Sequence, residues 1–398
     1  MNNPDIIHQV LNFLNDGSEE MIKDYMLVSS EWMKAVRNLD LFIAVYRKNI
    51  KKEQVELMMK STCLKNLTKL TIKFTDLDGV KAFCDNFAFD RLTSLAVNDS
   101  KLGVEGAKLI AQCQKLSNLK ELNVSVCDLH CEGAQVIVSS PVFSKLTSLD
   151  LGWNQIKDEG IKSLAMSEHM SNLTQLDLYL NLFGGDGLSA MATSPYLTNL
   201  TDLKMAELFL GEGIDSICDG KSLSNLTRLD LTENDLYEGA ITALNKSLTK
   251  ITDLNLTKNN IGDEGIEILA NSKFASTLKV LNITDNVLNP ASFKAISNSQ
   301  FLSNLEVLNA SSNFRVKDEG AKLIANSPTL SNLTELILED DSIGTEGACA
   351  IANSQYLTKL KKLNLSFNKI DEEGVKAIQN MNIQAKVGND KAKGCPQQ

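Results

Sequence analysis

Histidine and cysteine side chains, which could bind a metal or act in catalysis, come together in only one short segment of this sequence. The three histidines, His8, His130 and His169, lie outside the phrases typical of metalloproteases, catalytic triads and kinases. The segment Cys127–Cys131 holds two cysteines and His130, but it lacks the paired C-x-x-C or H-x-x-x-H spacing of structural zinc sites. We therefore favour structural roles for Cys127 and His130 over zinc binding.

Other classes of ligand chemistry are also disfavoured by the sequence. The glycine-rich run Gly184–Gly187 lacks the Lys-Ser/Thr pair that follows a phosphate-binding loop. A formal net charge of −10 disfavours general nucleic-acid binding, and no apolar run approaches the roughly 18 residues of a membrane helix. We expect a protein that is not an enzyme, with no catalytic residue, cofactor or metal, and no nucleic-acid or membrane partner. Its acidic surface would tolerate a basic protein partner.

The cysteines and the first residues indicate the compartment. Eight cysteines in 398 residues, several of them at positions that hold asparagine or apolar residues in other repeats, are typical of reduced thiols. The start, MNNPDIIHQVLNFLN, has neither a basic leader nor a small-residue cleavage site. We expect a cytoplasmic protein, with the nucleus as the alternative. In either compartment the Asn-x-Ser/Thr triplets, such as the one at Asn172, stay unmodified.

The elements that position any site are copies of one unit, best seen in Leu146–Asn172. Its first third has the period-2 spacing of a strand and its remainder has the i, i+3, i+4 spacing of a helix. The strand residues are Leu146, Leu149 and Leu151, and the helix residues are Ile161, Leu164 and Ala165. The phrase L-x-x-L-x-L recurs twelve times, at Leu67, Leu92, Leu119, Leu146, Leu173, Leu200, Leu226, Ile251, Leu278, Leu305, Leu333 and Leu360. Stacking of these copies would bury the apolar faces that one copy leaves exposed.

This phrase resembles the leucine-rich repeats, in particular the ribonuclease-inhibitor-like and F-box-associated subclasses. The resemblance implies an α/β solenoid, a horseshoe with a parallel β-sheet on its concave face and helices on its convex face. It also implies a ladder of hydrogen bonds from the asparagine that follows each strand. Asn154 and Asn368 are examples, Cys127 and Asp341 are variants, and Leu208 interrupts the column.

Two deviant copies locate the helix start and a loop tip. In the ninth repeat, Asn289 is predicted to be the N-cap and Pro290 the first helical residue, which places the usual Asp-Glu pair in the first helical turn. Glycine follows in eleven repeats and Ser292 in the other, which indicates close contact between stacked turns. The tenth repeat has one extra residue, so we expect Phe314 or Arg315 to point outward.

The predicted concave face carries charged and aromatic side chains around its middle. Between the last two leucines lies a column with Asp150, Asp177, Lys204 and Asp230, and nearby are Trp153, Tyr179 and Glu207. Adjacent strands lie about 4.8 Å apart, where two unit charges repel by roughly 3 kcal/mol at an effective dielectric constant near 20. One interpretation is a hot spot for a basic, partly apolar peptide. The alternative is a self-neutralising ladder of charges with aromatic rings that merely pack on one another.

The N-terminal 46 residues do not repeat and have helical periodicity. Their proline-acidic-aliphatic opening, the phrase from Val10 to Leu14 and the V-S-x-x-W phrase resemble an F-box, although Asn3 replaces the usual leucine and the middle is a few residues longer. That resemblance implies docking to a Skp-type adaptor through Pro4, Ile7, Leu11, Leu14, Val28 and Trp32. The alternative is a helical cap that only covers the first repeat.

These observations predict four segments and three candidate functions. The segments are an F-box-like helical domain (1–46), a linking helix (47–66), twelve repeats with a C-terminal cap (67–387) and a flexible tail (388–398). The leading hypothesis is the substrate-recognition subunit of a cullin-based ubiquitin ligase, in which the repeats hold a protein substrate. The alternatives are an interaction scaffold without a ubiquitin role and a small-GTPase regulator, for which Arg228 and Arg315 would be tested.

Overall fold

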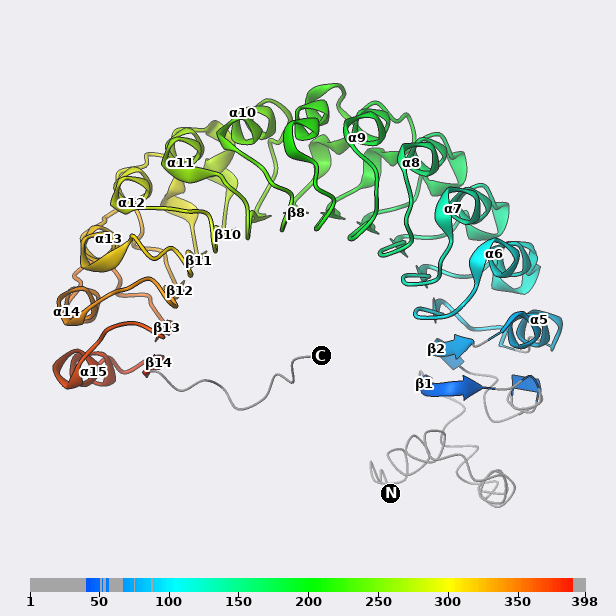
Figure 1. Ribbon diagram of the computed structural model, residues 1–398, viewed down its shortest axis with the longest axis horizontal. Helices are drawn as coiled ribbons and strands as arrows, with labels where there is room; N and C mark the ends of the chain where they lie inside the picture. The colour runs from blue at the N-terminus through cyan, green and yellow to red at the C-terminus, as the bar shows by residue number, and fades with distance from the viewer. Residues whose placement is uncertain are drawn as a thin grey trace, which may run out of the picture. The chain divides into compact units, whose positions relative to one another are not determined.

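Two compact units make up the chain. The computed structural model describes residues 41–50 (backbone only), 52, 55–56, 67–74, 76–86 and 89–388. The N-terminal unit comprises the described residues up to Phe183 together with Ser194–Leu200, and the C-terminal unit comprises Gly184–Thr193 and the described residues from Thr201 onward. In each unit the strands lie side by side and the helices lie behind them (Figure 1).

The N-terminal unit alternates strands with helices, and each strand pairs in parallel with the next. Its described strands are β1 (Leu41–Ile50), β2 (Leu67–Phe74), β3 (Ser94–Ala96), β4 (Glu121–Asn123), β5 (Ser148–Asp150) and β6 (Gln175–Asp177). Its described α-helices are α5 (Leu77–Asn86), α6 (Gly103–Gln112), α7 (His130–Val138) and α8 (Asp158–Ala165). Short 3₁₀ turns, such as η4 (Glu168–Met170), lead from a helix to the next strand.

The C-terminal unit has the same alternation and the same parallel pairing. Its described strands are β7 (Asp202–Lys204), β8 (Arg228–Asp230), β9 (Asp253–Asn255), β10 (Val280–Asn282), β11 (Val307–Asn309), β12 (Glu335–Ile337), β13 (Lys362–Ser366) and β14 (Gln384–Gly388). Its described helices are α9 (Gly185–Ala192), the 3₁₀ helix η6 (Gly211–Cys218), α10 (Glu238–Ser247), α11 (Gly262–Ala270), α12 (Pro290–Ser297), α13 (Lys317–Ala325), α14 (Thr345–Ala352) and α15 (Glu372–Gln379). The predicted leucine-rich-repeat architecture is thus confirmed.

Residues 41–50 differ from the sequence prediction, which was helical on both sides of position 46. They form strand β1, whose Ile43, Ala44 and Val45 lie opposite residues of β2. The segment LFIAVY is rich in β-branched and aromatic residues, and it covers the edge that β2 would otherwise expose. Of the predicted linking helix, Lys52, Val55 and Glu56 are described and are helical. The predicted F-box-like helices of residues 1–40 and the tail from 389 lie outside the described residues.

The leucine pattern forms the core. Leu146, Leu149 and Leu151 are at most 1% exposed, and Ile161 and Leu164 of α8 are equally buried. Each repeat therefore contributes one row of strand leucines and one helical stripe to the interior of its own unit, as the periodicity predicted.

The asparagine column forms the predicted ladder. Asn154 Oδ1 accepts from the backbone N–H of Cys127 and Leu129 at 3.0 and 3.2 Å, while its Nδ2 donates to the carbonyls of Val124 and Leu151. Equivalent bonds recur in the C-terminal unit at Asn234, Asn259, Asn286, Asn313 and Asn368. Leu208, the exception, is buried, and its N–H donates to Asn234 Oδ1 at 3.1 Å. These bonds satisfy buried backbone groups that no helix or strand pairs.

The helices begin where the deviant ninth repeat indicated. Asn289 is the N-cap of α12, its Oδ1 accepts from Ala291 N–H at 2.8 Å, and Pro290 is the first helical residue. Gly160 is an example of the close contacts expected of the glycine column: a Cβ on Gly160 would fall 2.5 Å from Ile156 Cγ2 and 3.3 Å from the Cα of Cys131 in the preceding repeat. The contact therefore involves a buried aliphatic side chain as well as the neighbouring backbone.

Candidate functional site

The predicted sheet-face residues divide between the two units. Asp150, Trp153, Asp177 and Tyr179 belong to the N-terminal unit, whereas Lys204, Glu207 and Asp230 belong to the C-terminal unit. Each group is therefore described within its own unit. The six predicted adaptor-binding residues, Pro4, Ile7, Leu11, Leu14, Val28 and Trp32, lie outside the described residues.

The neighbouring aspartates of the N-terminal unit have a structural role in addition to their charge. Asp150 and Asp177 face each other in the register of β5 and β6. Asp150 Oδ1 accepts from Gly152 N–H at 2.9 Å, and its Oδ2 accepts from Asn123 Nδ2 at 2.7 Å. Asp177 Oδ1 accepts from Tyr179 N–H at 3.1 Å. Asparagines occupy this position in several other repeats and bond in the same way, so charge is what distinguishes these two repeats.

The aromatic residues of the N-terminal unit show one packed ring and one exposed ring. A Cβ on Gly152 would lie 2.2 Å from two atoms of the Tyr179 ring, which shows that the ring lies directly over Gly152. Trp153, by contrast, is 54% exposed and has a positive φ of 52°. Leu182, which the sequence analysis did not select, is 57% exposed in the same unit. Tyr179 thus fits the packing interpretation, while Trp153 and Leu182 are available to a partner.

The charged residues of the C-terminal unit largely neutralise one another. Lys204 lies opposite Asp230 in the register of β7 and β8, and Asp230 Oδ1 accepts from the N–H and the hydroxyl of Thr232. Arg228 pairs with Asp253 at 3.0 Å and with Asp202 at 3.5 Å. The sheet face of this unit therefore resembles the self-neutralising ladder, and Arg228 is held by two carboxylates.

The Cys127–Cys131 segment contributes to the repeat scaffold. The thiol of Cys127 donates to the carbonyls of Val97 and Ser125, as the asparagine amide does in other repeats, and burial raises its pKa to about 12. His130 Nε2 lies 3.1 Å from Asp128 Oδ1, and Cys131 Sγ accepts from Lys157 N–H. Cys127 therefore occupies a ladder position, as predicted. Within the described ranges, no group of three or more His, Cys, Asp and Glu side chains is placed to hold a metal ion.

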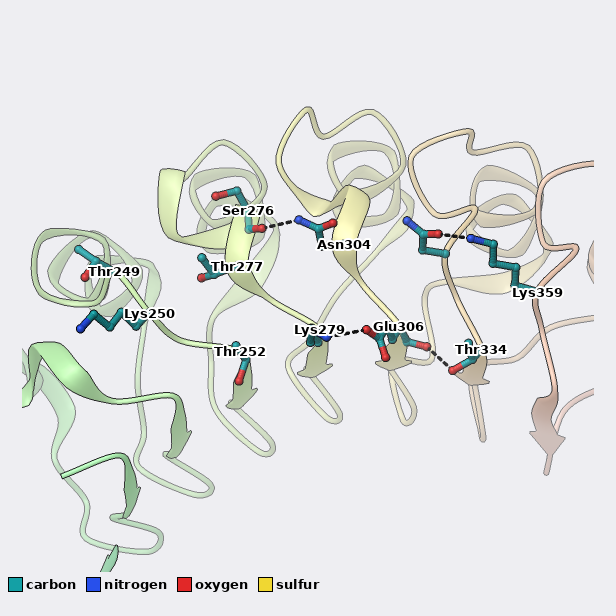
Figure 2. A pocket seen from close by; sticks show the side chains of 11 residues that line it. Thr249, Lys250, Thr252, Ser276, Thr277, Lys279, Asn304, Glu306, Thr334 and Lys359 are labelled. Atoms are coloured by element: carbon teal, nitrogen blue, oxygen red, sulfur yellow. Dashed lines mark hydrogen bonds and ion pairs between the residues drawn. The ribbon is translucent and has the colours of Figure 1, made fainter. Parts of the chain in front are cut away.

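Open hollows lie where the chain enters the strands. In the C-terminal unit, a hollow of about 730 Å³ lies along the residues that precede β9 to β13 (Figure 2). Its lysines are engaged: Lys279 pairs with Glu306 at 3.0 Å, and Lys359 Nζ donates to Asn332 Oδ1 at 2.6 Å. In the N-terminal unit, a hollow of about 770 Å³ is lined by Lys69, Arg91, Lys120 and Lys145 with Asp90 and Asn118. Both are shallow surfaces at the edge of a sheet, and neither has the buried polar groups of an active site.

A second column of asparagines runs along this edge. Asn172 Nδ2 donates to the carbonyl of Ser144, and Asn199 Nδ2 to that of Ser171, both at 2.8 Å. Asn304 and Asn332 make the same bond in the C-terminal unit. The Asn-x-Ser/Thr triplets at Asn172, Asn199 and Asn332 therefore have a structural role, because the asparagine amide joins one repeat to the preceding one.

Comparison with known proteins supports the repeat class and the fold. A family model described as "Leucine Rich repeat" matches residues 144–165, 169–192, 247–270 and 356–378. The fold is similar to that of an internalin (inlF) from Listeria monocytogenes, with 22% identity over 85% of this chain and 95% of that chain and a TM-score of 0.52. A structure of the Rad7 and Elc1 complex from yeast matches with 15% identity over 90% of this chain and 80% of that chain, at a TM-score of 0.46. No curated protein matches the chain.

The chain therefore contains leucine-rich repeats, an architecture that typically serves protein–protein interaction. Among the described residues, no helix is both long enough and apolar enough to cross a lipid bilayer.

Proposed function

We propose that this chain is a protein-interaction adaptor, the substrate-recognition subunit of a cullin-based ubiquitin ligase. In this proposal the repeats hold a protein substrate, and residues 1–46 dock a Skp-type adaptor. The observation that carries the interaction role is the repeat architecture with exposed Trp153 and Leu182 in the loops that follow β5 and β6. The ligase role is supported by the F-box-like phrases around Pro4, Leu11 and Trp32.

Adaptor docking is tested on the full chain by calorimetry against a purified Skp-type adaptor. We expect binding by the wild type and a loss of at least tenfold in affinity for Leu11→Ala combined with Trp32→Ala. Met166→Ala is the matched control, because Met166 is 65% exposed but lies at the end of α8 in the repeats. If the wild type does not bind the adaptor, the proposed ligase role is wrong. The remaining hypothesis is then an interaction scaffold that has no ubiquitin role.

Substrate binding is tested separately by affinity purification of the full chain and of Trp153→Ala. Because exposed tryptophans are frequent hot spots, we expect Trp153→Ala to lose the main co-purified substrate, while the adaptor and the cullin remain. The control Met166→Ala should retain all of them. Retention of every partner by Trp153→Ala would exclude this part of the sheet face as the substrate site.

A further inference from the structure

The residue that follows the ladder position differs in kind between repeats of the C-terminal unit. We call this the loop-tip position, and its occupants from the sixth to the eleventh repeat are Phe209, Asp235, Asn260, Val287, Phe314 and Ser342. Phe209 is 77% exposed, Val287 56% and Phe314 58%. The expectation that Phe314 or Arg315 points outward is confirmed for both. The loop tips therefore carry three of the exposed large apolar side chains of this unit.

The backbone conformation is energetically unfavourable for two of these apolar residues. Phe209 and Val287 have φ values of 55° and 61°, in the left-handed region, as have Asp235 and Ser342 at the same position. Asp, Asn and Gly adopt this region at little cost, whereas a β-branched or bulky side chain there is strained. Neither burial nor backbone preference accounts for Phe209 and Val287. A contact with something outside the unit would account for both, since strained residues tend to mark binding sites.

The loop tips form a continuous row. Asn286 N–H donates to Asn313 Oδ1 at 3.0 Å, so the following residues, Val287 and Phe314, lie in adjacent loops. Between Phe209 and Val287, Asn260 Nδ2 and the Tyr237 hydroxyl both donate to Asp235 Oδ1, at 2.7 and 3.3 Å. Tyr237 is itself 48% exposed and adds an aromatic ring to the row. Along five successive repeats, a hydrogen-bonded polar pair is thus flanked by Phe209 on one side and by Val287 and Phe314 on the other.

Acidic side chains predominate beside this row. The residues just before the ladder position are Glu207, Glu233, Lys258, Asp285, Ser312 and Asp340. With Asp235 and Arg315, the row therefore has five carboxylates and two cations. Lys258 pairs with Glu233, and its pKa is raised first by Glu233 and further by the charges of Asp285 and Glu207. The cation is thus shared among several acids, and a net negative potential remains along the apolar row.

We propose that the loop tips of the C-terminal unit bind a basic protein segment with apolar side chains. Phe209, Val287 and Phe314 contact its apolar residues, and Asp235 and Asp285 pair with its Arg or Lys residues. The repeats are spaced by about 4.8 Å and an extended chain rises about 3.3 Å per residue, so roughly six residues of the partner reach from Phe209 to Phe314. A second copy of this chain is disfavoured as the occupant, because its formal net charge is also −10. This surface runs along the loop tips, shares Glu207 with the predicted sheet face, and does not depend on docking of the N-terminal residues to an adaptor.

The test measures binding of fluorescent twelve-residue peptides to the full chain by anisotropy. The three probes alternate Leu with Arg, Ala with Arg, and Leu with Glu. We expect the Leu/Arg peptide to bind at least tenfold more tightly than the other two, because only this peptide supplies both apolar contacts and positive charge. Equal affinity for Ala/Arg would mean simple charge attraction, and equal affinity for Leu/Glu would mean unspecific apolar contact. Either result would overturn the proposal.

Variants locate the site and separate it from folding defects. Phe209→Asn with Val287→Asn should weaken Leu/Arg binding at least tenfold, while the melting temperature stays constant or rises because asparagine suits the left-handed backbone. The matched control is Tyr356→Asn, which removes an exposed aromatic side chain of the same unit away from the loop tips. Unchanged affinity in the double variant, or an equal loss in the control, would contradict the assignment.

Discussion

Asp341 occupies a ladder position where most other repeats have asparagine, but its carboxyl group makes fewer hydrogen bonds than the asparagine amide does. Oδ1 accepts from Asn313 N–H at 2.7 Å, but Oδ2 is buried without a hydrogen-bond partner among the described residues. In the preceding repeat, the Asn313 amide donates to the carbonyl of Ala310 at the corresponding place. Burial raises the Asp341 pKa to about 8, so the group is mostly protonated at neutral pH. A protonated Oδ2 can donate as an amide does.

We expect Asp341→Asn to stabilise the protein in a pH-dependent manner. The folded-state pKa lies above the unfolded value of 3.8, so the folded state binds more protons and the wild type loses stability as pH rises toward about 8. The advantage of the asparagine variant should therefore be small near pH 4, grow to about 1–3 kcal/mol by neutral pH, and level off above pH 8. Urea unfolding at pH 4, 6, 7 and 9 measures it.

The matched control is Asp340→Asn, which changes the adjacent carboxyl group. Asp340 is only half-buried, and its charge raises the Asp341 pKa less than burial does, so this change should alter stability by less than Asp341→Asn does. A pH-independent effect of Asp341→Asn would contradict the buried, protonated carboxyl group.

At the scale of the helix, the first-turn glycines explain how tightly the repeats stack. A Cβ on Gly265 of α11 would lie 2.5 Å from Ile261 Cγ2 and 3.1 Å from Glu238 Cα of the preceding repeat. A Cβ on Gly239, at the same position of α10, would meet nothing within 4 Å. One column of the sequence therefore contains both a necessary glycine and a replaceable one.

We expect Gly265→Ala to lower the free energy of unfolding by about 1–3 kcal/mol, because the buried Ile261 and the neighbouring backbone must shift. Gly239→Ala should instead be neutral or stabilise by about 0.5–1 kcal/mol, since alanine is the better helix residue and has room there. Thermal and urea denaturation of the two variants measures the difference. Equal effects of the two substitutions would refute the close approach at Gly265.

Much of the repeat scaffold was predictable from the sequence, since repetition supplies twelve aligned copies of one unit. The leucine core and the N-cap at Asn289 follow from periodicity and residue type, and the asparagine ladder follows from the resemblance to leucine-rich repeats. The hydrogen bonds of Asp318 could not be predicted in this way. As a first-turn acid it was expected to stabilise its own helix, yet its Oδ1 accepts from Gly344 and Gly347 N–H at the start of the next helix. Such bonds depend on how neighbouring repeats stack, which spacing within one repeat does not show.

The candidate site was less predictable than the scaffold. The alternation within each strand showed that Asp150 and Trp153 leave the core, but it did not show that Tyr179 lies over Gly152. The loop tips were missed except at Phe314, because the leucine pattern says nothing of the residue after the asparagine. A signal was present: Phe209 stands in a column where other repeats have Asp235 or Asn260.

At the scale of the whole chain, a stack of repeats is open at its ends, and each terminal strand must be covered. In the C-terminal unit, β14 pairs with all five residues of β13, from Lys362↔Gln384 to Ser366↔Gly388. The residues of β14 alternate between exposed and half-buried, and Lys386 places a charge on this last strand. Charged residues on an edge strand oppose pairing with another molecule. β14 is therefore a cap that protects the more regular β13.

We expect a chain that ends at residue 383 to expose the edge of β13, and hence to self-associate. Its melting temperature should also fall by about 2–8 °C, the shift expected if roughly 1–2 kcal/mol of stability is lost. Light scattering coupled to size exclusion, together with thermal denaturation, measures both. A chain that ends at residue 388 keeps β14 and should match the full-length protein in both measurements. If the chain ending at 383 were monomeric with an unchanged melting temperature, β14 would be dispensable, and the edge of β13 would need no cover because its own Lys362 already discourages pairing.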